Sequence, residues 1–69
     1  MLARRRAIGT RLRDARGAAH LSQEQLAHLA GIDRKTVVRL ESGTSDARLG
    51  VWMRLARAIG VSLADLVRE

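Results

Sequence analysis

The sequence predicts a small all-α domain, and three observations support this. The 69 residues include no proline and one aromatic residue, and no stretch shows the alternation of apolar and polar residues that strands require. Apolar residues instead recur every three or four positions. Glycine, serine and aspartate separate these segments at positions where helices begin and end. A chain this short buries only about 60% of its unfolded surface, so we expect one compact domain.

The first expected helix covers residues 4–18. Its apolar positions at helical spacing are Ile8, Leu12, Ala15 and Ala19. The second expected helix begins at Ser22, because Ser22 and Gln25 have the spacing of a capping box. In that motif each side chain accepts a hydrogen bond from the other residue's backbone amide. This helix is expected to end at Ala30.

The third expected helix follows after a very short turn. Gly31 supplies the backbone freedom for the turn, Asp33 caps the helix, and Gly43 ends it. Two short helices joined in this way are typical of a helix-turn-helix unit. Its core is expected to contain the apolar residues Leu26, Ala27, Ile32, Val37 and Leu40.

A fourth and a fifth helix complete the expected domain. Asp46 is the best candidate to cap the fourth helix, which ends before Gly60. Its expected apolar face consists of Leu49, Trp52, Leu55, Ala56 and Ile59. Ser62 and Asp65 form a second capping box, which begins a short last helix.

Positive charge is concentrated at the beginning of the chain. The formal net charge is +6, and residues 1–20 carry six arginines against one acidic residue, Asp14. A local basic excess is typical of a protein that binds nucleic acid, but also of a solvated helix face. The arginines at positions 4–6 are consistent either with an arm along the DNA backbone or minor groove, or with a solvated tail.

The helix-turn-helix segment resembles the Cro/C1-type (XRE-like) family. That family's usual pattern is LSQEELA, then AG, then a helix ending in LE-x-G, and the chain has LSQEQLA, AG and RLESG. The later segment RLARAIGVSLADL resembles the family's fourth and fifth helices. The resemblance covers roughly residues 8–67 and implies a compact five-helix, lambda-repressor-like DNA-binding domain. We expect this domain at residues 7–69 and a basic N-terminal arm at residues 1–6.

The resemblance also implies roles for individual residues. The helix that begins near Asp33 enters the major groove, and its expected base-contacting residues are Arg34, Lys35, Thr36 and Arg39. Arginine and lysine suit the acceptors of guanine, so we expect half-sites that contain G. The expected phosphate-contacting residues, through side chains or backbone amides, are Gln23, Asp33, Ser42, Gly43 and Thr44. Arg16 and Glu41 match a partly buried salt bridge of the family.

One recognition helix contacts only a few base pairs, so relatives dimerise and place two helices about 34 Å apart. We therefore expect a homodimer, formed around the last helix through Leu63 and Val67. The expected function is sequence-specific binding of double-stranded DNA by a cytoplasmic transcriptional regulator, and the family resemblance implies a repressor that reads the major groove.

Other functions remain as alternatives. An antitoxin would bind operator DNA and neutralise a partner toxin, and an exposed Leu29 would favour that function. A basic peptide acting on membranes fits poorly, because several helix caps indicate a folded domain. His20 and His28 lack companions at metal-ligand spacing, and the chain has no cysteine. We expect no enzyme activity, no metal and no cofactor.

Overall fold

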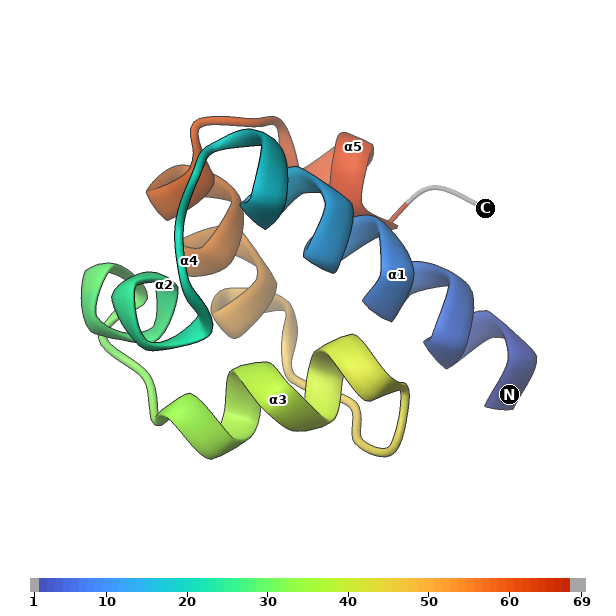
Figure 1. Ribbon diagram of the computed structural model, residues 1–69. Helices are drawn as coiled ribbons and strands as arrows, with labels where there is room; N and C mark the ends of the chain where they lie inside the picture. The colour runs from blue at the N-terminus through green and yellow to red at the C-terminus, as the bar shows by residue number, and fades with distance from the viewer. Residues whose placement is uncertain (1, 68–69) are drawn as a thin grey trace.

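The computed structural model describes the chain from residue 2 to residue 67 and contains five helices within that range (Figure 1). Their limits are α1 Leu2–Ala18, α2 Gln23–Ala30, α3 Arg34–Ser42, α4 Leu49–Ile59 and α5 Leu63–Val67. No strand occurs among the described residues. The predicted all-α class and the five helices are confirmed. Helix α1 includes the described part of the basic segment 1–6, so this segment is helical from Leu2 onward.

Local capping explains where two of the helices begin. Ser22 Oγ accepts a hydrogen bond from the Gln25 amide at 3.0 Å, and the Ser22 amide donates to Gln25 Oε1 at 2.8 Å. Ser62 and Asp65 form the equivalent pair of hydrogen bonds at 3.2 and 3.3 Å. Both capping boxes occur where the sequence predicts them, because the motif needs only residues three positions apart.

Two other caps differ from the prediction. Asp33 occupies the position before α3, but its side chain makes no capping hydrogen bond. Asp46 does not begin α4, which starts at Leu49 with Arg48 at the cap position. The Asp46 carboxylate accepts instead from the amide of the next residue, Ala47, at 2.8 Å. The carboxylate oxygen that would have accepted a capping hydrogen bond from the first turn of α4 is therefore bonded to the Ala47 amide.

The helices pack around a single core. Helix α1 packs against α3 and α5, α2 packs against α3 and α4, and α4 packs against α5. The fully buried large side chains come from all five helices and are Leu12, Leu26, Val37, Leu40, Leu55 and Leu66. Leu49 was expected in this core but is 61% exposed, since α4 begins at this residue and turns it away from the core. No helix in the described range is long and apolar enough to cross a membrane.

Helices α1 and α3 approach each other very closely at Gly9. A Cβ atom placed on Gly9 would lie 2.6 Å from the Glu41 carbonyl oxygen, and nearer still to that of Leu40. Real Cβ atoms do not approach backbone oxygen so closely, so only glycine allows this contact. The sequence contains a second glycine in α1, Gly17, where an added Cβ would meet no atom within 4 Å.

We expect Gly9→Ala to destabilise the domain by about 1–3 kcal/mol, because the new methyl group must push α1 away from α3. Gly17→Ala is the matched control and should stabilise the helix by about 0.5–1 kcal/mol. Urea unfolding followed by circular dichroism measures both. Equal stability of the two variants would show that α1 does not depend on this close contact.

Candidate nucleic-acid interface

Helix α3 has one buried face and one cationic face. Val37, Leu40 and Glu41 are buried against the rest of the domain. The opposite face exposes three cationic side chains and one apolar side chain, namely Arg34, Lys35, Arg39 and Val38, and these residues line a shallow hollow with Asp33. Thr36, also expected to contact bases, is half-buried. Burial of one face thus fixes which side chains α3 presents to a ligand.

The three cations on α3 have no partner among the described residues. Arg34, Lys35 and Arg39 make no side-chain hydrogen bond or ion pair there. Their charge is therefore available to an external acceptor. Asp33 lies beside them, and its carboxylate would repel a phosphate. A phosphate contact at Asp33 would have to come from its backbone amide.

Arg16 and Glu41 connect α1 to the C-terminal end of α3. Arg16 donates from Nε to Glu41 Oε2 at 2.6 Å and from Nη2 to Glu41 Oε1 at 3.0 Å. The Glu41 side chain is 4% exposed and that of Arg16 is 16% exposed. Hydrogen bonding to Glu41 raises the pKa of Arg16 above its usual value, although burial opposes this. The charged groups of Arg16 and Glu41 are thus paired with each other within the protein.

The same cluster includes the beginning of α2. Arg16 Nη1 donates to the Leu21 carbonyl at 2.8 Å, and Gln23 Nε2 donates to Glu41 Oε1 at 3.1 Å. Gln23 was expected to contact a phosphate, and sequence reasoning did not anticipate this bond to Glu41. The bond fixes the first residue of α2 beside α3, so the two elements expected to touch DNA are held in one orientation.

The loop after α3 presents hydroxyl groups rather than free amides. The Gly43 amide donates to the Arg39 and Leu40 carbonyls, and the Thr44 amide donates to the Arg39 carbonyl at 3.1 Å. Ser42 Oγ and Thr44 Oγ1 lie 2.9 Å apart and are exposed. These amides complete the end of the helix. Phosphate contacts from this loop would therefore use the hydroxyl groups of Ser42 and Thr44, not the buried Gly43.

Among the side chains whose exposure the structure describes, four large apolar ones are well exposed, and they lie on three helices. They are Leu29 on α2, Val38 on α3, and Leu49 and Met53 on α4. Leu63 and Val67, the expected dimer residues, are half-buried and pack partly against the core. Helix α4 therefore exposes more apolar surface than α5 does, through Met53 and through Leu49, which the sequence assigned to the core.

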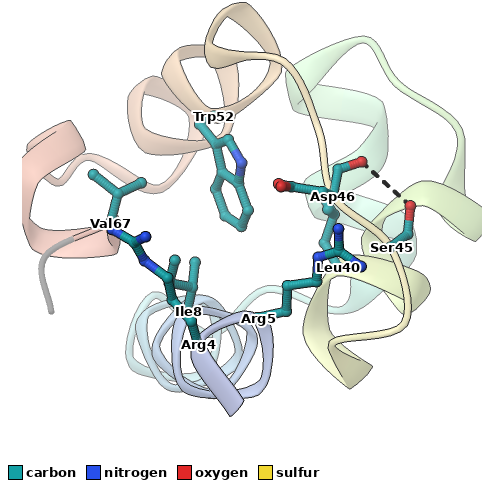
Figure 2. Close-up of a pocket in the computed structure, with 8 residues that line it drawn as sticks. All are labelled: Arg4, Arg5, Ile8, Leu40, Ser45, Asp46, Trp52 and Val67. Carbon is teal, nitrogen blue, oxygen red and sulfur yellow. Dashed lines mark hydrogen bonds between the residues drawn. The ribbon is translucent and has the colours of Figure 1, made fainter. Parts of the chain in front are cut away.

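A pocket of about 430 Å³ lies between the start of α1, the loop after α3, α4 and α5 (Figure 2). Its apolar lining consists of Ile8, Leu40, Trp52 and Val67, and its polar lining of Arg4, Arg5, Ser45 and Asp46. Figure 2 shows Arg4 and Arg5 extending from the same helix toward different sides of this pocket. No histidine is among the residues that line this pocket. Among the described residues, no group of three acidic, histidine or cysteine side chains could hold a metal.

Comparison with known proteins gives consistent results. A family model described as helix-turn-helix matches residues 12–66. The cryptic phage CTXphi transcriptional repressor RstR from Vibrio cholerae is 33% identical over 62 residues, which cover 90% of the chain and 56% of RstR. The chain thus spans little more than half the length of that relative. An uncharacterized HTH-type transcriptional regulator from Archaeoglobus fulgidus is 35% identical over 57 residues, covering 83% of the chain and 81% of the relative.

Solved structures share the fold over nearly the whole chain. The restriction-modification controller protein C.AhdI from Aeromonas hydrophila matches with a TM-score of 0.91 and 39% identity, covering 93% of the chain and 97% of C.AhdI. The clp gene regulator ClgR from C. glutamicum matches with a TM-score of 0.88 and 25% identity, covering 93% of the chain and 82% of ClgR.

We expect Glu41→Gln to destabilise the domain by up to about 3–5 kcal/mol, because it leaves the partly buried Arg16 without a counter-charge. Glu24→Gln, at an exposed site on α2, should change stability by less than about 0.5 kcal/mol. Urea unfolding measures both. A raised pKa means that Arg16 contributes stability below its unfolded pKa and loses it only at strongly alkaline pH. The difference in free energy of unfolding between the wild type and Glu41→Gln should therefore be the same in neutral and in mildly alkaline buffer. If Glu41→Gln and Glu24→Gln are equally stable, the ion pair does not stabilise the domain.

Proposed function

The chain belongs to the Cro/C1-type (XRE-like) family of helix-turn-helix regulators, and from this membership we propose that it represses transcription by reading an operator as a homodimer. It is a DNA-binding transcription regulator and not an enzyme, and its fold is the lambda-repressor-like all-α fold. Repression is favoured by the likeness to RstR, which is itself a transcriptional repressor. The protein would act in the cytoplasm, where it meets the chromosome.

The observation that carries this proposal is the cationic face of α3. Arg34, Lys35 and Arg39 are exposed together and have no partner among the described residues. In the major groove, arginine and lysine donate to guanine O6 and N7, while Thr36 would contact the base beside them. Buried Val37 and Leu40 on the opposite face hold the helix in position, so the three cations reach the bases from a rigid support.

Contacts to the DNA backbone would flank this helix on both sides. Gln23 lies at the start of α2, and the exposed hydroxyls of Ser42 and Thr44 lie at the end of α3. The amide of Asp33 completes the proposed set, whereas the Gly43 amide is left out because it already donates to two carbonyls at the helix end. Such contacts fix the register of the protein on DNA and do not read sequence.

Homodimer formation follows from the small footprint of one domain. Dimeric relatives place equivalent helices about one helical turn of DNA apart, roughly 34 Å, and a domain that measures 28 Å along its longest axis is small enough for two copies to fit that spacing. The proposed interface, called here the α4–α5 surface, consists of Leu49, Met53, Leu63 and Val67. Leu49 and Met53 are 61% and 51% exposed, and α4 packs against α5. Association would remove this apolar area from water.

A second candidate function is that of a DNA-binding antitoxin that neutralises a partner toxin. The observation that favours it is Leu29, which is 58% exposed at the end of α2. Leu29 lies in a shallow hollow whose lining also includes His28 and two arginines, Arg54 and Arg57. An apolar residue surrounded by positive charge suits a protein partner with an acidic surface.

Selection of binding sites from random duplex DNA at near-physiological salt tests the first function. We expect a palindrome whose half-sites contain G. Arg34→Ala, Lys35→Ala and Arg39→Ala should each relax the preference at one position by about 1–3 kcal/mol, a roughly 5-fold to 150-fold effect. Arg57→Ala, on exposed α4 surface, is the control and should leave the preference unchanged. If no motif is enriched, or if all four variants select the same motif equally well, α3 does not read the operator.

The homodimer has its own test in sedimentation equilibrium. Leu49→Glu and Met53→Glu each bring like charges together across the α4–α5 surface, and we expect each to weaken association at least tenfold. Both sites are exposed, so the fold should survive. Leu29→Glu removes a similarly exposed leucine on α2 and should leave the dimer intact. A wild-type protein that stays monomeric, or a dimer lost only with Leu29→Glu, would contradict this interface.

A further inference from the structure

The arginines of α1 separate into groups by the neighbours they contact. Arg16 is bonded to Glu41. Arg4 and Arg11 lie seven residues apart, and so on one side of the helix. That side borders α5, because Arg11 Nη1 donates to the Leu66 carbonyl at 3.5 Å and Arg4 lines the same pocket as Val67.

Arg6 and Arg13 form a different pair, again seven residues apart but on the side of α1 that borders the end of α3. A Cβ atom on Gly43 would lie 2.8 Å from Arg6 Cγ and 2.9 Å from Arg6 Cα, so the start of α1 is in contact with the loop after α3. Figure 1 shows the same closeness between the beginning of α1 and that loop. Arg13 lies further along this side, about 10 Å from Arg6 at the helical rise per residue.

Neither side chain is neutralised within the protein. Arg6 and Arg13 are exposed and make no hydrogen bond or ion pair among the described residues. The first turn of α1 contains no acidic residue. The helix dipole adds partial positive charge at the same end. One free cation, Arg6, and the positive end of α1 therefore lie next to the loop that carries Ser42 and Thr44, and Arg13 lies about two turns further along the same side of α1.

The length of α3 indicates what would meet these cations. Nine residues of helix extend about 13 Å, close to the roughly 12 Å width of the major groove. When α3 occupies the groove, its C-terminal end at Gly43 comes near the edge of the groove, where the phosphates lie. Arg6 is in contact with Gly43, so it reaches the same edge.

We propose that α1 is a second DNA-binding element, in which Arg6 and Arg13 bind backbone phosphates beyond the base pairs that α3 reads. This inference rests on the proposed function and extends it. The basic segment acts from a helix fixed against the domain, and not as a separate arm in the minor groove. It adds affinity and salt dependence without changing the preferred sequence, because phosphates are the same at every position.

The test is the salt dependence of binding to the selected operator. Arg6→Gln and Arg13→Gln remove the charge but keep the Cβ and Cγ atoms, so the packing of Arg6 against Gly43 is preserved. Each should lower the log–log slope of affinity against salt by about one unit per bound protomer, hence by about two for the homodimer, and the double variant by about twice as much. The base preference should not change. Arg57→Gln on α4 is the matched control and should leave the slope at its wild-type value, whereas Arg6→Lys should retain the wild-type slope.

The possible failures are distinguishable. If the wild-type protein has no preferred sequence, the proposed function fails, and the same slopes measured on random duplex still test Arg6 and Arg13. If the wild-type protein binds its operator and both glutamine variants keep the wild-type slope, the inference about α1 is wrong and α3 binds alone. Loss of base preference in Arg6→Gln would also overturn it, because Arg6 would then be reading bases. Unfolding curves of the variants confirm that each remains folded.

Discussion

The contact between α1 and the C-terminal end of α3 determines how the rest of the domain is arranged. It depends on a glycine, Gly9, because any larger residue would collide with the Leu40 and Glu41 carbonyls. Arg16 then closes over Glu41 with two hydrogen bonds on the same helix pair. Since Glu41 also accepts from Gln23, the start of α2 is tied to the same point. These contacts thus fix the orientation of α3 from its C-terminal end.

Features that depend on neighbours in the sequence were the most predictable. Both capping boxes need residues only three positions apart, and the glycines after α2, α3 and α4 end those helices in left-handed conformation. Asp46 was predicted wrongly although it has a suitable side chain, because a nearer amide at Ala47 competes for it. The later start of α4 then places Leu49 outside the core, so one local competition altered both a boundary and the burial of a residue.

Features that depend on tertiary contacts were less accessible. In the sequence, Gly9 is only a residue with low helix propensity. The reason for a glycine at this position is the backbone of α3, which leaves no room for a Cβ atom. The seven-residue spacing of Arg6 and Arg13 predicts that they share one side of a helix, but the sequence does not indicate which other helix that side borders. The cationic residues of α3 came from the family resemblance together with the buried positions of Val37 and Leu40. The bond between Gln23 and Glu41 joins residues 18 positions apart and has no local signal.

Trp52 is an intrinsic fluorescence probe of the packing of this domain. It is the single tryptophan of the chain, and it is 7% exposed in the wall of the pocket between the start of α1 and α5. Any separation of α1 from α4 or α5 would admit water to the indole ring and shift its emission to longer wavelength. The fluorescence of Trp52 therefore reports the separation of these helices without any label. Comparing its transition with the loss of helical structure shows whether the helices separate before the helices themselves unfold or at the same time.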